Sequence, residues 1–113
     1  MDVVPYDEAD AEEVLDGVHL AQLAAGDRMS VQHFRIEPGA VVGEHSHHHE
    51  QTGFVVEGAL TFVVDGEHTV VGAGDSFTIP SDEPHAAENR GGVPVVGVEL
   101  FGPPRPVPPW AED

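Results

Sequence analysis

The sequence predicts an all-β domain, built as a small antiparallel sandwich or barrel. Short apolar or alternating runs recur along most of the chain, and turns containing glycine or proline separate them. Asp65-Gly66, between two such runs, is a strong signal for a tight hairpin. No segment has the spacing of a long amphipathic helix. Short strands without long helices are typical of small antiparallel barrels, and 113 residues suffice for one such domain.

The two ends of the chain differ in composition from its middle. Residues 7–16 are rich in aspartate and glutamate, so we expect residues 1–17 to form an exposed acidic lead-in. The barrel domain is predicted over residues 18–101. Residues 102–113 form a proline-rich tail, which cannot continue a hydrogen-bonded ladder because proline lacks the backbone donor. Trp110 in this tail is expected to dock on the barrel or on a partner subunit.

Within the barrel domain, each predicted strand is a short run that ends at a turn. The first runs to Pro38-Gly39, with Phe34 and Ile36 on one face and His33 and Arg35 on the other. The predicted strands are Met29–Glu37, Thr52–Val56, Ala59–Val64, Glu67–Val71, Ser76–Ile79 and Pro94–Phe101. Further strand-like segments are expected around the histidines at 45 and 85.

The charge balance is strongly acidic. The chain has 21 aspartate and glutamate residues against 4 arginines, has no lysine, and carries a formal net charge of −17. This charge repels nucleic acid and anionic membranes, so neither is an expected partner. Since salt screens such self-repulsion, an acidic surface without lysine predicts a halophilic, high-salt cell.

Cysteine and targeting signals are missing from the sequence. Without cysteine, disulfides and thiolate ligands are excluded, and a metal ion must be held by imidazole, carboxylate, amide or water. The first residues lack the basic and apolar regions of a signal peptide, and no apolar run is long enough to span a membrane. We therefore expect a soluble, cytoplasmic protein.

A histidine cluster in the middle of the chain is the strongest functional signal. His45 and His47 are one residue apart on an apparent strand, where alternate side chains point to the same face. Neutral imidazole is the commonest protein ligand for transition metals, so two convergent rings supply half of a coordination sphere. A purification tag would lie at a terminus, whereas this cluster lies between strands. The sequence therefore predicts a metal site.

Two gapped motifs around these histidines resemble those of the cupins. The first, G-x5-H-x-H-x3,4-E-x6-G, is matched by Gly39, His45, His47, Gln51 and Gly58, with glutamine in place of glutamate. The second, G-x5-P-x-G-x2-H-x3-N, is matched by Gly74, Pro80, His85 and Asn89, with Asp82 in place of the second glycine. The resemblance implies a double-stranded β-helix, or jelly-roll, barrel of two antiparallel sheets.

The same resemblance implies one divalent transition metal ion at the mouth of the barrel. Its ligands would be His45, His47, Gln51 and His85, a set that accepts Ni, Zn, Fe, Mn or Co. The amide oxygen of Gln51 is neutral and binds a metal more weakly than a carboxylate does. His49 has the same parity as the first two histidines and is either an extra ligand or a group behind the ligands. We expect the second, because the chain should be turning there.

A narrower resemblance, to the pectin-degradation (KdgF-like) cupins, concerns the last strand. It is carried by residues 45–51 and 53–58 and by Glu99-Leu-Phe101-Gly-Pro-Pro-Arg105. That family converts 4,5-unsaturated monouronates, the products of pectin and alginate lyases, into linear keto sugars. The resemblance implies that Glu99 transfers a proton, that Arg105 binds the substrate carboxylate and that Phe101 forms a wall of the pocket. The family's acid is usually aspartate, one methylene shorter.

Several alternatives stay open at this point. Glu99 could point outward from its strand, and Arg105 could be a surface arginine that faces nearby acids. Other functions of a metal-binding cupin are a metal-dependent dioxygenase and a non-catalytic protein that binds a sugar or another small molecule. The tail residues favour the uronate reaction. We also expect a homodimer, because a small barrel with an edge strand and an apolar tail can cover both by self-association.

Overall fold

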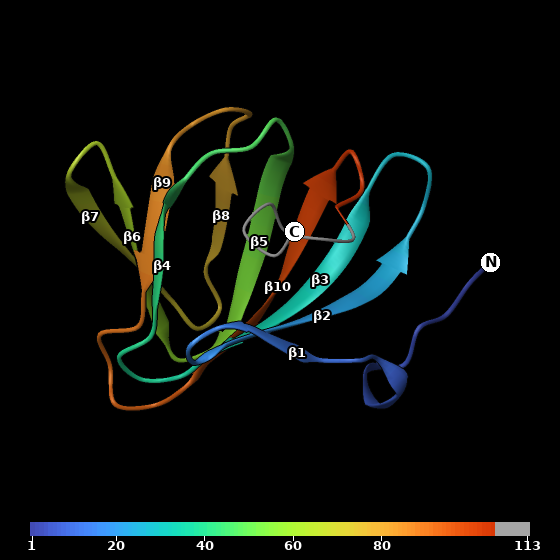
Figure 1. Ribbon diagram of the computed structural model, residues 1–113, viewed down its shortest axis with the longest axis horizontal. Helices are drawn as coiled ribbons and strands as arrows, with labels where there is room; N and C mark the ends of the chain where they lie inside the picture. The colour runs from blue at the N-terminus through green and yellow to red at the C-terminus, as the bar shows by residue number, and fades with distance from the viewer. Residues whose placement is uncertain (106–113) are drawn as a thin grey trace.

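The chain folds as two antiparallel β-sheets that face each other across one apolar core, as seen in the computed structural model, which describes residues 1–105 (Figure 1). The larger sheet has six strands in the order β1 (Glu12–Leu15), β2 (Val18–Ala25), β3 (Ser30–Ile36), β10 (Val95–Gly102), β5 (Glu50–Glu57) and β8 (Ser76–Ile79). The smaller sheet has four, in the order β4 (Val41–His45), β9 (His85–Glu88), β6 (Ala59–Val64) and β7 (Glu67–Gly72). The chain crosses repeatedly between the sheets, so the predicted all-β jelly-roll is confirmed.

The core lies between the sheets and follows the alternation of side chains along each strand. On β3, Ser30, Gln32, Phe34 and Ile36 are buried, while the residues between them face outward. On β10 the inward positions include Val95 and Phe101, both fully buried. The apolar core draws on both sheets and consists of Val18, Leu20, Phe34, Ile36, Ala40, Val42, Val55, Leu60, Phe62, Val71, Ile79, Ala87 and Val95.

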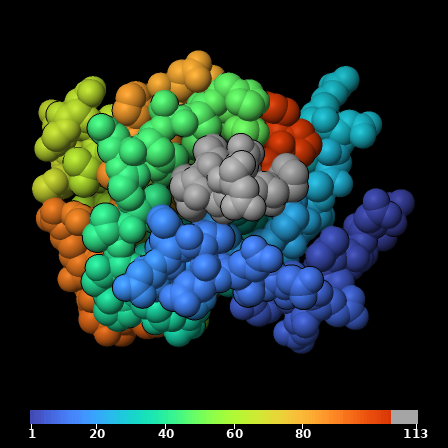
Figure 2. Space-filling view, viewed as in Figure 1, coloured from blue at the N-terminus to red at the C-terminus, as the bar shows by residue number. Residues whose placement is uncertain are grey.

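The N-terminal segment, residues 1–17, is largely exposed and contains regular structure. A 3-10 turn, η1 (Tyr6–Glu8), precedes β1, which pairs with β2 at the edge of the larger sheet. Val14 and Leu15 pack against the core, which explains why a strand forms in an otherwise acidic run. In Figure 2 the first residues project at one edge of the molecule. Within residues 1–105, no helix is long and apolar enough to cross a membrane.

Two residues at motif positions, Gly58 and Asp82, lie at specific backbone turns. Gly58 joins β5 to β6 with a φ of +80°, and a Cβ added there would lie 2.5 Å from the Pro94 carbonyl oxygen. Only glycine fits both conditions. Asp82, which replaces the second glycine of the second motif, has a φ of +65°, so it adopts the left-handed conformation that glycine would adopt at no steric cost.

The residues that follow β10, up to Arg105, lie against the barrel. The backbone N–H of Arg105 donates to Ser30 Oγ at 2.9 Å, which fixes the start of the tail against β3. Trp110, predicted to dock on the barrel or on a partner, lies outside the described residues.

Candidate metal centre and adjoining pocket

The candidate ligands meet at one end of the barrel, where the loops after β4 and before β9 lie side by side (Figure 1). His45 ends β4 and is the register partner of His85, which begins β9. His47 lies beyond the end of β4, so the expected single strand carrying both histidines is wrong. The loop is instead held by neighbouring turns: Asp82 N–H donates to the His47 carbonyl at 2.8 Å, and Ser81 Oγ donates to the His48 carbonyl at 2.6 Å.

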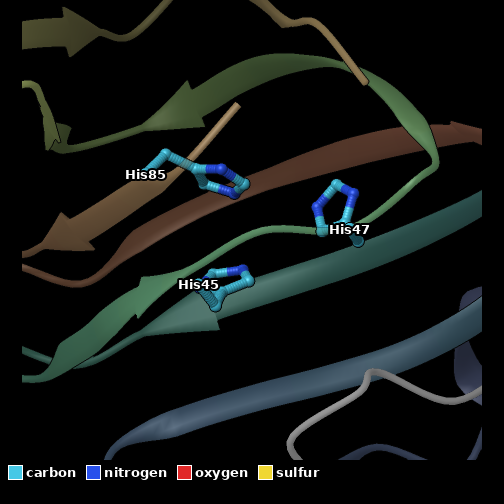
Figure 3. Close-up of side chains that lie close together, drawn as sticks. All are labelled: His45, His47 and His85. Atoms are coloured by element: carbon cyan, nitrogen blue, oxygen red, sulfur yellow. The ribbon is translucent and has the colours of Figure 1, made fainter. Parts of the chain in front are cut away.

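The three histidines converge on one point (Figure 3). One ring nitrogen from each of His45, His47 and His85 lies within 4.8 Å of the others, a spacing that could hold a metal ion. His47 and His85 are buried, and His45 is half-buried. The neighbouring ring centroids of His45 and His85 are 4.4 Å apart. Their convergence therefore results from the pairing of β4 with β9 and from the anchored loop between β4 and β5.

Each histidine is oriented by a hydrogen bond to a backbone carbonyl. The Nδ1 atoms of His45, His47 and His85 lie 2.9, 3.0 and 2.9 Å from the carbonyl oxygens of Gly43, His49 and Glu83. A carbonyl can only accept, so each Nδ1 carries the proton. In a neutral ring the lone pair is then on Nε2, which leaves Nε2 as the ligand atom. Histidines that bind metals are generally fixed in this way.

Gln51 brings a fourth donor atom from the larger sheet. Its side chain points inward from β5 and is 4% exposed. Oε1 lies 3.1 Å from His47 Nε2, and Nε2 donates to Glu99 Oε1 at 2.8 Å. In the neutral His47 ring, Nε2 and Gln51 Oε1 are both acceptors. Two acceptor atoms at this distance suit a shared cation, and one of them belongs to the group of three convergent histidines, so the residues present fit a divalent ion.

Burial keeps the imidazoles in the neutral form that a metal requires. Desolvation lowers the pKa of His45 from 6.5 to about 4, against the opposing effect of its bond to the Gly43 carbonyl. Desolvation, together with the positive charge of Arg105, also lowers the pKa of His47. At neutral pH both rings therefore carry no charge.

Glu99 points into the barrel. It lies on the same face of β10 as Val95 and Phe101, and it lines the pocket that also reaches His45 and His85. Burial raises the pKa of Glu99 to about 7, although the charge of Arg105 and the amide hydrogen bonds favour the ionised form. The carboxyl group can therefore both hold and release a proton near neutral pH.

Phe101 and Arg105 also lie close to the candidate ligands. Phe101 is fully buried, and its ring centroid is 5.9 Å from that of His47. The guanidinium carbon of Arg105 lies 3.7 Å from the centre of the Phe101 ring, and the side chain is 3% exposed. Burial lowers the pKa of Arg105 to about 10, with Glu99 acting in the opposite direction, so the group stays positive at neutral pH. Arg105 is thus a pocket residue.

Gln32 is a pocket residue that the sequence analysis missed. It is 2% exposed on β3, and its Nε2 donates to Glu99 Oε2 at 3.3 Å. The sequence pattern could have indicated it. Gln32 has the same strand parity as Phe34 and Ile36, so its polar side chain is expected to face the core. A buried amide of this kind requires a partner, and Glu99 supplies it.

His49 is buried behind the loop, beyond the three convergent histidines. Its ring centroid lies 6.1 Å from that of Phe101, and a hydrogen bond with the Pro104 carbonyl raises its pKa against the larger lowering effect of burial. These contacts link the histidine loop to the segment that carries Arg105.

The sequence comparison identifies the family. Residues 32–101 match the family model described as "Cupin domain", which is more than half of the chain. This chain is a cupin. The match includes the three histidines and Glu99, so the predicted membership is confirmed together with the fold.

Solved cupin structures align over nearly the whole of this cupin. KdgF from Halomonas sp. is 28% identical with a TM-score of 0.83, over 94% of this chain and 96% of that one. An RmlC-like cupin from Shewanella frigidimarina is 26% identical with a TM-score of 0.84, over 94% of each chain. The predicted resemblance to the KdgF-like cupins is therefore supported by an alignment of both sequence and fold.

A curated relative matches over a shorter region. Mannose-1-phosphate guanylyltransferase of Escherichia coli is 32% identical over 77 residues, which is 67% of this chain and 16% of that protein. The cupin thus spans about a sixth of the length of that relative.

Proposed function

We propose that this cupin binds one divalent transition metal ion through His45, His47, Gln51 and His85 and converts 4,5-unsaturated monouronates into linear keto sugars. The observation that carries the proposal is that Glu99 and Arg105 line the pocket beside the candidate ligands, with Phe101 packed against Arg105. The similarity to KdgF from Halomonas sp. supports the resemblance from which this reaction is taken.

The conversion is an isomerisation, so no oxidant or co-reactant is needed. The hemiacetal hydroxyl loses its proton, the bond between the ring oxygen and the anomeric carbon breaks, and the ring oxygen takes up a proton, so an aldehyde and an enol form. The enol then becomes the ketone when a proton is added at carbon and the enol hydroxyl loses its own. A bound divalent ion would polarise the ring oxygen or the neighbouring hydroxyl as a Lewis acid.

Glu99 is the group in the pocket that suits the proton transfers. General acid–base catalysis is most effective when the pKa lies close to the working pH, and the pKa of Glu99 is about 7. The hydrogen bonds from Gln51 and Gln32 fix both carboxyl oxygens, so the proton is accepted and returned from a defined position.

Arg105 and Phe101 suit substrate binding. A guanidinium group offers two parallel N–H donors that match the uronate carboxylate, and in an acidic protein this charge has to be supplied locally. The Phe101 ring packs against the guanidinium, with the guanidinium carbon 3.7 Å from the ring centre, and so helps to fix its position. The carboxylate would therefore be held on the side of Arg105, with the hemiacetal toward the histidines.

The test is turnover of an unsaturated monouronate by metal-loaded protein at high salt, followed by loss of the ultraviolet absorbance of the double bond. Replacing Glu99 with glutamine removes the proton-transfer group but keeps its shape, and turnover should fall by about 10²–10⁴-fold at saturating metal. The exposed variant Glu67→Gln serves as the charge-matched control and should keep the parent rate. A parent protein without turnover, or a Glu99→Gln variant as active as the parent, would contradict the proposed reaction.

We also propose a homodimer that forms through the outer face of the larger sheet. Phe54 and Val56 on β5 are 44% and 52% exposed, and Val98 on β10 is the register partner of Phe54. An apolar strip of this kind is unusual on a chain with a net charge of −17. Light scattering in high salt should give twice the chain mass for the parent and the single mass for Phe54→Ser. A monomeric parent would overturn the dimer.

A further inference from the structure

Gln51 lies between two groups whose chemistry fixes the orientation of its amide. On one side Nε2 is 2.8 Å from Glu99 Oε1, and on the other Oε1 is 3.1 Å from His47 Nε2. The reversed amide would bring its oxygen against a carboxyl oxygen and its NH2 group toward the point where the imidazole nitrogens meet. Glu99 therefore determines which end of Gln51 faces the candidate metal position.

The orientation of Glu99 is itself fixed. Its second oxygen accepts a hydrogen bond from Gln32 Nε2 at 3.3 Å, and Gln32 is 2% exposed. A continuous series of contacts thus runs from Gln32 through Glu99 and Gln51 to His47, across β3, β10 and β5 of one sheet. Neighbouring strands hold the three side chains in register: Glu99 is the partner of Gln32 on one side and of Gly53, two residues from Gln51, on the other.

The charge of the site also indicates a role for Glu99 in metal binding. Three neutral imidazoles and an amide contribute no negative charge toward a divalent cation. Arg105 adds a positive charge to the same pocket, and Glu99 is the acidic residue among those that line it. The cupin motif normally has a carboxylate at the position of Gln51. In this chain that position holds an amide, and the carboxylate of Glu99 lies behind it, joined to it by a hydrogen bond.

We propose that Gln51 and Glu99 act together as a divided metal ligand, in which Gln51 supplies the donor oxygen and Glu99, as a positioning residue, orients the amide and supplies the negative charge. This inference rests on the proposed metal site and adds a role for Glu99 that is separate from proton transfer. It is comparable to the carboxylate that orients a metal-binding histidine through a hydrogen bond, with an amide in place of the imidazole.

A charge-exchange experiment tests the divided ligand without any substrate. The dissociation constant for Zn²⁺ is measured by chelator competition on metal-stripped parent, Glu99→Gln, and the double variant Gln51→Glu/Glu99→Gln. The single change keeps the shape but removes the charge and permits the amide to reverse, so affinity should fall by about 10–100-fold. The double variant moves the carboxylate to position 51 and keeps an amide at 99 to donate to it, so affinity should return to within a few-fold of the parent.

Two controls separate this effect from others. Glu67→Gln, which removes an exposed charge on β7, should bind Zn²⁺ like the parent, and the thermal unfolding of the metal-free variants should show that all are folded. Parent affinity in Glu99→Gln, or a double variant no better than Glu99→Gln, would overturn the divided ligand alone. A parent that binds no Zn²⁺ would overturn the metal site as well, whereas a parent that binds Zn²⁺ but turns over no uronate overturns only the proposed reaction.

Discussion

At the scale of single residues, the position of Arg105 depends on shape as well as charge. Its guanidinium carbon lies over the Phe101 ring, 3.7 Å from the centre, and the planar, delocalised guanidinium packs on a ring in a way that a lysine ammonium cannot reproduce. We therefore predict that Arg105→Lys raises the KM for the uronate by about 10-fold with a smaller effect on kcat, and that Arg105→Ala raises it by about 100-fold. Steady-state kinetics measure both. Arg90→Ala, at an exposed arginine that does not line the pocket, is the matched control, and an unchanged KM in Arg105→Ala would rule out the carboxylate-binding role.

The buried histidines make the stability of the metal-free protein depend on pH. The pKa of His45 is about 4 in the folded protein against an ordinary 6.5, so between these values the unfolded chain binds more protons. The same direction holds for His47 and His49. We predict that the free energy of unfolding falls as the pH is lowered from about 6.5 to about 4. Urea unfolding in high salt, which screens the surface acids, measures the effect.

Glu99 has the opposite influence, which provides an internal check. Its pKa is raised to about 7 from an ordinary 4.5, so the folded state binds the extra proton and gains stability as the pH falls through this range. Removing this group in Glu99→Gln should therefore make the loss of stability on acidification steeper than in the parent. A Glu99→Gln variant that becomes more stable between about pH 6.5 and 4 would mean that the histidines are not desolvated, because this variant lacks the opposing contribution of Glu99.

The site residues that the sequence predicts well are those whose spacing is fixed by a motif. The histidines and Gln51 belong to two motifs with fixed spacings, and the structure brings them together. The orientation of Glu99 was ambiguous because β10 is apolar on both faces: Val96 and Val98 face outward while Val95 and Phe101 face inward. Alternation cannot distinguish the two faces of such a strand. Only the packing of β10 between β3 and β5 decides it.

At the scale of elements, the turn between β8 and β9 supports the histidine loop. Asp82 has a φ of +65°, and its backbone N–H donates to the His47 carbonyl at 2.8 Å. A side chain with a Cβ is strained in this conformation, and aspartate tolerates it better than alanine does. We predict that Asp82→Ala lowers the free energy of unfolding by about 1 kcal/mol, whereas Asp82→Gly leaves it equal or higher.

Thermal and urea unfolding of the two variants measure this difference. Because both variants lose the same carboxylate, the comparison isolates the backbone conformation from the charge. If alanine and glycine gave the same stability, the left-handed conformation at this turn would carry no cost.

The strands themselves were largely predictable, and the exceptions have physical causes. The hairpin of β6 and β7 was expected at its observed position because Asp65-Gly66 specifies the turn locally. Neither β1 nor β2 was among the predicted strands, and the four residues of β1 gain stability from the packing of Val14 and Leu15 on a core formed by distant strands. The end of β4 at His45 was also missed, because the loop after it is held by contacts with Ser81 and Asp82.

At the scale of the whole molecule, the dominant feature is a net charge of −17 on 113 residues. The repulsion among surface carboxylates opposes the compact state, and the Debye length falls from about 10 Å at 0.1 M salt to about 3 Å at 1 M. We predict that Tm rises by about 5 °C or more between about 0.1 M and 2 M NaCl, equivalent to about 1 kcal/mol. Calorimetry measures it, with uncharged sucrose at equal osmolarity as the comparison. A Tm independent of NaCl would argue against a fold adapted to high salt.

The distribution of the candidate ligands between the two sheets has a mechanical consequence. His45 and His85 belong to the smaller sheet and Gln51 to the larger one, and the loop of His47 crosses from one to the other. An ion bound by His45, His47, Gln51 and His85 would cross-link the two sheets at the open end of the barrel. Backbone amides of β4, β9 and β5 would then exchange with deuterium as one cooperative unit when the ion is bound, and the two sheets could separate at that end only after the ion had left.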